Sequence, residues 1–284
     1  VNKIITMDQT GYINKILARF DTCNVYRTNV PMRAIKFSKV KCPQLDSVPR
    51  YDCSDCTTKY YREIIGSLMY AVLTRPDIAY AVHRLAQYVE NPLPHHWDAV
   101  MYLLGYIKAH NNYKLTYTPG PIVLKAYVDS DFAGCIDTSR STSGFVIFIN
   151  NCVINFKSVV QKSTAMSSTE AEYVAAAQCA SYISWFRAFL DELDHKQTTP
   201  TRLFEDNEGV EALAKNPVKR SKARHIRRAY HFLREMVTEF KTLSIHPVRS
   251  NKNIADIFTK PVQKNILSTL LPFLFDSNNT IKQY

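Results

Sequence analysis

The spacing of hydrophobic residues predicts that the first part of the chain is helical. In several segments apolar side chains recur every three or four positions, as in helices that bury one face. These segments are residues 7–20, 60–74, 76–90 and 96–109. Proline-containing breaks at 74–77 and 91–94 separate the last three, because proline suits the first turn of a helix but not its interior. Residues 21–58 show little periodicity and contain prolines, so we expect an irregular linker.

From residue 119 onward the spacing changes to that of strands. Val123–Val128 alternates, with Leu124, Ala126 and Val128 on one face. Two apolar runs, 142–150 and 152–157, surround Asn150-Asn151, and because asparagine tolerates positive φ we expect a tight hairpin. A helix, a strand at 202–205, a basic helix, a strand near 243–248 and a short final helix follow. This order predicts an α/β domain with a mixed five-stranded sheet flanked by helices.

Acidic residues stand at the ends of four of these elements. Asp129 follows the first strand, Glu172 lies in the first turns of a helix, Asp206 ends a later strand, and Asp256 begins the final short helix. Mg²⁺ prefers oxygen ligands. Two such ions about 3.5–4 Å apart stabilise the attacking and leaving oxygens of a phosphoryl displacement. The pattern therefore predicts a site for two Mg²⁺ ions.

The helix that contains Glu172 offers two candidate glutamates. Ser167-x-x-Glu170 and Thr169-x-x-Glu172 both fit a capping box, which would give either glutamate a purely structural task. Glu172 shares a helix face with small side chains that would let the helix lie close to the sheet. These are Ala175, Ala176 and Cys179.

The other three acids have structural interpretations as well. Asp129 and Asp131 have the same strand parity, and either could be a solvated residue at a turn. Asp206 is preceded by Glu205, a competing candidate. Asp256 could simply interact with a helix dipole, which is worth about 0.3–1 kcal/mol. The occurrence of four acids, each at the end of a different helix or strand, favours metal binding over these separate explanations.

Several runs of sequence together resemble one family. The runs are Tyr127–Gly134, Ser141–Gly144, Ser167–Ala175, Asp206-Asn207, Arg224–Ile226 with Tyr230–Phe232, and Ala255–Pro261. In this order they resemble the ribonuclease H domain at the C-terminal end of copia-type retrotransposon Pol polyproteins. Upstream, Tyr12–Phe20 resembles the end of the reverse-transcriptase thumb, and Tyr61–Tyr80 resembles the connection that follows it.

The resemblance implies a ribonuclease H-like fold whose first and fourth strands are adjacent, which would put Asp129 beside Asp206. It implies that Asp129, Glu172, Asp206 and Asp256 are the catalytic residues and the metal ligands, and so favours Glu172 over Glu170. It implies two Mg²⁺ ions, for which Mn²⁺ could substitute. The expected reaction is hydrolysis of the RNA strand of RNA·DNA hybrids, in an intracellular, cytoplasmic setting within a virus-like particle.

The resemblance also divides the chain. Residues 1–58 are expected to form the end of the thumb and a linker, 59–118 a helical connection, 119–262 the ribonuclease H domain, and 263–284 a C-terminal tail. The chain begins at Val1 without a signal peptide, so we expect a piece of a longer polyprotein. Its expected partner is the upstream polymerase domain, whose active site is absent from this chain. A non-catalytic nucleic-acid-binding relic and a connection module are the alternative functions.

Charge points to a polyanionic partner. The formal net charge is +11 and the pI about 9.2. Residues 215–234 carry many basic side chains and no acid. We expect phosphate contacts from Arg224, Arg227, Arg228, His231 and Arg234; the alternative is a solvated charged face. On the opposite side of this helix we expect burial of Ile226, Tyr230, Leu233, Val237 and Phe240.

The remaining candidate metal ligands are weaker. The chain has 7 cysteines, and an odd number without a secretory signal favours reduced thiols. Cys53-x-x-Cys56, with Cys42 upstream, lacks the second pair or nearby histidine of a tetrahedral zinc site, so the role of these cysteines stays open. We expect His95 and His96 to be surface residues of a first helical turn. No apolar run approaches the roughly 20 residues of a membrane span.

Overall fold

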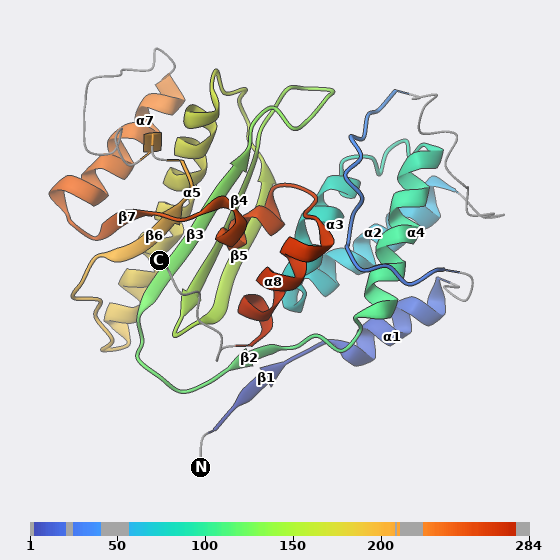
Figure 1. The fold of residues 1–284 in the computed structure, drawn as a ribbon, viewed down its shortest axis with the longest axis horizontal. Helices are drawn as coiled ribbons and strands as arrows, with labels where there is room; N and C mark the ends of the chain where they lie inside the picture. Colours follow the sequence, from blue (N-terminus) through green and yellow to red (C-terminus); the bar gives the residue numbers. More distant parts are fainter. Residues whose placement is uncertain (1–2, 21–24, 41–56, 208, 211–223, 277–284) are drawn as a thin grey trace.

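The computed structural model describes residues 3–20, 25–40, 57–207, 209–210 and 224–276, with side chains in the last range from 228 onward. Cys42, Cys53 and Cys56 and the side chains of Arg224 and Arg227 lie outside the described residues. Figure 1 shows a group of helices on one side of the molecule and a five-stranded sheet with its own helices on the other.

The helical part forms as its hydrophobic spacing predicts. It contains α1 (Thr10–Arg19), α2 (Thr58–Ala71), the 3₁₀ turns η2 (Val72–Thr74) and η3 (Pro76–Ile78), α3 (Ala79–Ala86) and α4 (Pro94–Ala109). Proline occupies the first position of η3 and of α4. A backbone N–H at this position has no partner within the helix, so proline, which lacks it, costs no hydrogen bond there. Between these two prolines the buried stripe of Ile78, Val82 and Leu85 has the expected helical spacing.

The five-stranded sheet has the predicted mixed topology. Its strands are β3 (Leu124–Asp131), β4 (Thr142–Ile149), β5 (Cys152–Val160), β6 (Thr201–Glu205) and β7 (Leu243–Pro247), in the spatial order β5-β4-β3-β6-β7. β3, β4 and β5 pair antiparallel, whereas β6 is parallel to both β3 and β7. The first and fourth strands are therefore adjacent, which is the strand order expected for the ribonuclease H-like fold.

The hairpin between β4 and β5 turns at the two predicted asparagines. Asn150 and Asn151 have φ angles of 47° and 62°, in the left-handed region that asparagine tolerates. β3 extends further than its hydrophobic alternation indicated, through Asp129 to Asp131. Asp129 is therefore held inside a paired strand.

Each face of the sheet covers its own hydrophobic core. Leu124, Ala126 and Val128 pack against α5 (Ser168–Glu192) and α7 (Arg224–Arg234). Tyr127 and Phe204 point the other way and join the core of the helical part. The helical part thus packs directly on the sheet, on the face opposite α5 (Figure 1).

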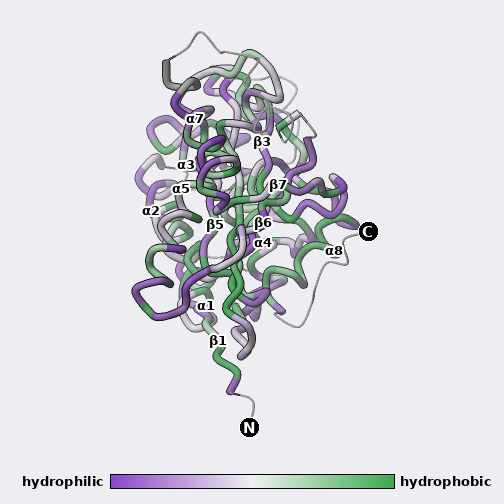
Figure 2. Tube along the Cα trace, turned by 90° about the vertical axis from the view of Figure 1, so that its left-hand side faces the viewer, coloured by the Kyte–Doolittle hydropathy of each residue, from purple (hydrophilic) through white to green (hydrophobic). Residues whose placement is uncertain are grey.

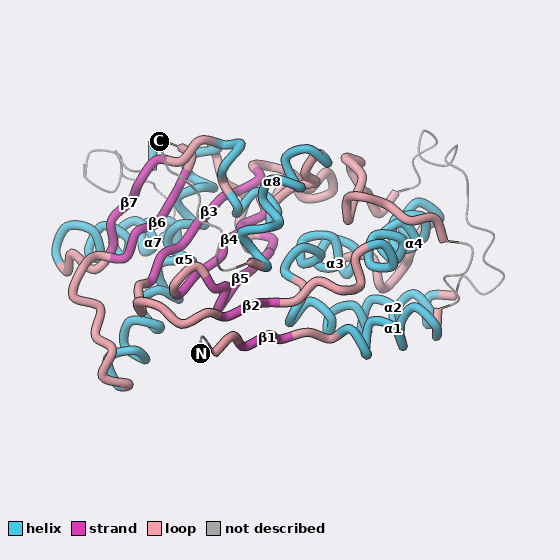
Figure 3. The backbone as a smooth tube through the Cα atoms, turned by 60° about the horizontal axis from the view of Figure 1, so that its bottom comes forward, coloured by secondary structure: helices cyan, strands magenta, loops and turns pink. Residues whose placement is uncertain are grey.

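The C-terminal segment adds to the second of these cores. After η5 (Ser250–Lys252) and η6 (Ile254–Phe258) the chain forms α8 (Lys264–Phe275), which buries Leu267, Leu270 and Leu274. A small antiparallel sheet of β1 (Ile5–Met7) and β2 (Leu115–Tyr117) lies between the helical part and the large sheet (Figure 3). β1 is exposed, and Figure 2 shows it as a hydrophobic segment at the lower end of the molecule. Among the described helices none combines the length and hydrophobicity required to cross a membrane.

The expectation that His95 and His96 are surface residues is wrong. Both are buried, because the segment that carries Phe37 folds over the start of α4 and its ring packs against both imidazoles. His96 stacks on Tyr88 with ring centroids 3.8 Å apart, and its Nδ1 accepts a hydrogen bond of 3.0 Å from the backbone N–H of Leu93. Burial lowers the pKa of His96 to about 3, so this histidine is a neutral helix cap.

The predicted burial of Phe240 is also wrong. The α7 helix continues into a π-helical turn, η4 (Glu235–Glu239), whose extra residue per turn rotates the following side chains out of register. Leu233 and Met236 are buried, Tyr230 and Val237 are half-buried, and Phe240 is 66% exposed.

Candidate active site

Asp129 occupies the point where η6 meets the sheet. Its β4 partner in the strand pairing is Gly144. A Cβ atom at Gly144 would lie 2.6 Å from Cγ2 of Thr259 and 2.7 Å from Cβ of Phe258. Only glycine therefore lets η6 come this close to the strands. This explains the glycine of the Ser141–Gly144 run.

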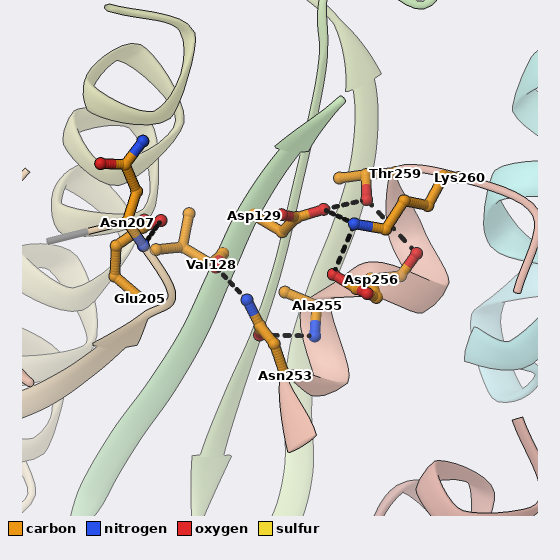
Figure 4. A network of polar contacts seen from close by, with 9 residues as sticks. All are labelled: Val128, Asp129, Glu205, Asn207, Asn253, Ala255, Asp256, Thr259 and Lys260. Atoms are coloured by element: carbon orange, nitrogen blue, oxygen red, sulfur yellow. Dashed lines mark hydrogen bonds and ion pairs between the residues drawn. The ribbon is translucent and has the colours of Figure 1, made fainter. Parts of the chain in front are cut away.

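Two polar contacts hold η6 against β3. Fully buried Asn253 donates from Nδ2 to the backbone oxygen of Val128 at 2.9 Å, and its Oδ1 accepts from a backbone N–H two residues on at 3.1 Å (Figure 4). At the other end of η6, the hydroxyl of Thr259 donates to the carboxylate of Asp129. Asp256, between these contacts, is thereby fixed beside Asp129.

The structure brings the four sequence-predicted acids together with a fifth. Carboxylate oxygens of Asp129, Asp206 and Asp256 lie within 4.8 Å of one another, and this set is called the first acidic group below. Oxygens of Glu172, Glu205 and Asp206 meet the same limit and form the second acidic group. Asp206 belongs to both because it follows β6, the strand next to β3.

Glu170 and Glu172 have different tasks. The hydroxyl of Ser167 accepts from the backbone N–H of Glu170 at 3.2 Å, and a carboxylate oxygen of Glu170 accepts from the N–H of Met166 at 2.8 Å. Glu170 is thus part of the N-terminal cap of α5. Glu172 reaches the second acidic group instead.

Glu205 is the acidic residue that the sequence analysis ranked too low. It is 2% exposed, and Oε1 accepts from the backbone N–H of Asn207 at 3.3 Å (Figure 4). Strand parity could have identified it, because Glu205 lies two residues after Leu203 and so shares its face of the sheet, which faces α5. The face of α5 that carries Glu172 lies on the same side of the sheet. Asp131, at the end of β3, lies in neither acidic group.

Burial raises the pKa values of four of these acids, including that of Asp129. The pKa of Glu172 rises to about 9, from burial first and then from the charges of Asp129 and Asp206. Burial likewise raises the pKa of Glu205 well above its usual value and that of Asp256 to about 7. Because metals bind the ionised form, a divalent cation would compete with protons for the carboxyls whose pKa values are raised.

Lys260 supplies positive charge on one side of the site. Its Nζ lies 3.0 Å from Oδ1 of Asp256 and 3.6 Å from Oδ2 of Asp129 (Figure 4). Burial alone would lower the pKa of Lys260, but the charges of these two carboxylates raise it above its ordinary value. The sequence analysis gave Lys260 no role.

The donor set fits a hard divalent cation. All five side chains offer carboxylate oxygens, the ligands that Mg²⁺ prefers. Oε2 of Glu172 and Oε2 of Glu205 are buried and have no hydrogen-bond partner in the described part of the chain. A buried charge without a partner is unfavourable, so a cation would supply what these oxygens lack.

The basic helix lies near the acidic groups. Tyr230 of α7 stacks on Tyr173 of α5 with centroids 4.0 Å apart, and Tyr173 follows Glu172 directly. Arg228 and His231 are exposed and Arg234 is half-buried, with Nη2 of Arg234 3.2 Å from Nδ1 of the histidine. These side chains are available to an anionic ligand.

The strand order, the helix placement and the acidic groups define a ribonuclease H-like domain with an extra helical unit packed on one face. No family model matches the chain. Over 261 residues it is 34% identical to the retrovirus-related Pol polyprotein from transposon TNT 1-94 of Nicotiana tabacum, covering 91% of this chain and 19% of that protein. Over 259 residues it is 34% identical to the corresponding polyprotein from transposon RE1 of Arabidopsis thaliana, covering 91% and 17%. The chain belongs to the copia-type retrovirus-related Pol polyproteins and spans about a fifth or less of these relatives.

The chain is also similar to solved ribonuclease H1 structures. The crystal structure of RNase H1 from Halobacterium salinarum NRC-1 aligns at 19% identity and a TM-score of 0.35, over 48% of this chain and 93% of that one. LC11-RNase H1, isolated from compost, aligns at 16% identity and a TM-score of 0.37, over 53% and 99%. The ribonuclease H-like topology itself rests on the strand order given above.

Proposed function

We propose that this chain is the ribonuclease H of a copia-type Pol polyprotein, a metal-dependent endonuclease that hydrolyses the RNA strand of RNA·DNA hybrids. The observation that carries the proposal is the sharing of half-buried Asp206 by two groups whose other carboxylates are buried. A single structural ion pair or helix cap would not need five acids in one place. Two adjacent binding sites for divalent cations do.

In this proposal Asp129, Asp206 and Asp256 hold one Mg²⁺ ion, and Glu172, Glu205 and Asp206 hold the other. When bound, two such ions activate a water for attack and stabilise the leaving 3′ oxygen, leaving a 5′ phosphate and a 3′ hydroxyl. Mn²⁺ would substitute for Mg²⁺, because it accepts the same oxygen ligands.

Other residues of the protein orient the proposed metal-binding carboxylates. The hydroxyl of Thr259 and the amide of Asn253 fix the carboxylate of Asp129 and the end of β3. The carboxyls of Glu172, Glu205 and Asp256 are buried where α5, β6 and η6 meet. No serine or cysteine nucleophile is required, since the attacking group is water.

The basic helix is proposed to bind the hybrid through phosphates. Arg224, Arg227, Arg228, His231 and Arg234 provide the charge, and such contacts give affinity without reading sequence. The RNA strand would be distinguished by its 2′-hydroxyls. Residues 119–262 would form the nuclease domain, 59–118 the connection, 1–58 the end of the thumb and a linker, and 263–284 the tail. The partner would be the upstream polymerase region of the same polyprotein.

The test is cleavage of a hybrid with a labelled RNA strand. The wild-type chain should cleave it with Mg²⁺ and stop when a chelator is added. Asp129→Asn should bind the hybrid and not cleave it, whereas Asp131→Asn, changed at the neighbouring acid outside both groups, should retain cleavage. Binding without cleavage by the folded wild-type chain would instead support a non-catalytic relic.

A further inference from the structure

Lys260 lies inside the proposed metal site. It lies two residues after the end of η6, and its ammonium contacts Asp256 at 3.0 Å and Asp129 at 3.6 Å. Both residues belong to the first acidic group. The ammonium therefore already pairs with two of the three carboxylates that a cation would use there.

The glutamates of the second acidic group have no such positive partner among the described residues. Glu172 and Glu205 form no ion pair with lysine or arginine in the part of the chain that the structure describes. Each keeps a buried oxygen, Oε2, without a hydrogen-bond partner among those same residues. A cation entering this group meets unpaired carboxylates, whereas one entering the first group meets Lys260.

The ammonium of Lys260 is also free to move away from the two carboxylates into water. Its side chain is 40% exposed, in contrast to 3% for Asp129 and 11% for Asp256. A lysine carries its charge on a flexible four-carbon stem, so its ammonium can move into water without disturbing the backbone. The two carboxylates, held by Thr259 and by η6, stay where they are.

We propose that Lys260 is an internal competitor for the divalent cation at the first acidic group, present there in the free protein and displaced when the cation binds. The proposal rests on the proposed function. It makes the two groups unequal: the second group loads at low cation concentration and the first only at a higher one. Lys260 would thus set the cation concentration at which the first acidic group is filled.

The test counts bound Mn²⁺ in the whole chain without nucleic acid, by electron paramagnetic resonance of the free ion. The wild-type protein should show one tighter and one weaker site. Lys260→Met, which keeps the stem and removes the charge, should tighten the weaker site at least tenfold and leave the tighter one within about twofold. Lys260→Arg should keep it weak. Lys264→Met, at an exposed lysine four residues on, controls for the loss of one charge.

The outcomes separate the two proposals. Equal Mn²⁺ affinities in the wild-type and Lys260→Met proteins, with the weaker site lost in Asp129→Asn, would refute the competition and leave the nuclease proposal intact. Equal tightening by Lys264→Met would also refute it, because the effect would then be general charge. Failure of both wild type and Lys260→Met to bind Mn²⁺ would overturn both proposals. Lys260→Gln replaces Lys260→Met if circular dichroism shows the latter to be unfolded.

Discussion

Replacing Gly144 by alanine should separate η6 from the sheet and disable the first acidic group. The new Cβ would lie 2.6 Å from Cγ2 of Thr259, and ordinary contact begins at 3.4 Å, so the two segments must part by about 0.8 Å (3.4 − 2.6). Overpacking of this kind costs about 1–3 kcal/mol, which lowers the melting temperature by roughly 2–12 °C in a chain of this size. A shift near 1 Å in catalytic geometry costs up to about a hundredfold in rate.

The assays are thermal unfolding and single-turnover cleavage of a labelled hybrid. Gly66→Ala is the matched control, because nothing lies within 4 Å of a Cβ at that position of α2. It should stabilise the protein by about 0.5–1 kcal/mol, the gain expected for alanine over glycine in a helix. A Gly144→Ala protein with the stability and cleavage rate of the wild type would refute the close approach of η6.

Three further predictions concern the acids and the basic helix. Glu170→Gln should weaken the N-terminus of α5 by about 0.3–1 kcal/mol, because it removes a negative charge there, and should keep cleavage, whereas Glu172→Gln should abolish cleavage; the reverse would exchange their roles. Without metal, the free energy of unfolding should fall as pH rises, because folding raises the pKa of Glu172 from 4.5 to about 9 and also raises that of Glu205. The stabilisation from these protonated groups is complete below about pH 4.5 and is lost as pH passes about 9. In chemical-denaturation curves, saturating Mg²⁺ should remove this loss. Arg228→Ala and Arg234→Ala should each flatten the slope of log affinity against log salt by about 0.7–0.9 for hybrids of any sequence, and an unchanged slope would leave this face merely solvated.

Local patterns were enough to predict the framework of the site. Alternation placed Asp129 on the face of its strand opposite Leu124 and Ala126. The hairpin at Asn150-Asn151 followed from the backbone freedom of asparagine. These features depend on residues close in sequence or on simple strand parity.

The features that sequence analysis missed depend on distant segments. His95 and His96 are buried because the segment around Phe37 covers them, and nothing near the histidines indicates this cover. Phe240 is exposed because of a π-helical turn that hydrophobic spacing does not show. Lys260 contacts the carboxylate of Asp129 only because η6 docks beside β3, a contact between residues far apart in the sequence.

The central claim is that the two acidic groups are two adjacent cation sites. Crystals soaked in saturating Mn²⁺ and measured at the manganese absorption edge test it most directly, since anomalous scattering locates the ions. The account predicts two peaks about 3.5–4 Å apart, one ligated by Asp129, Asp206 and Asp256 and the other by Glu172, Glu205 and Asp206. No peak at these carboxylates, or a single peak that does not touch Asp206, would contradict it.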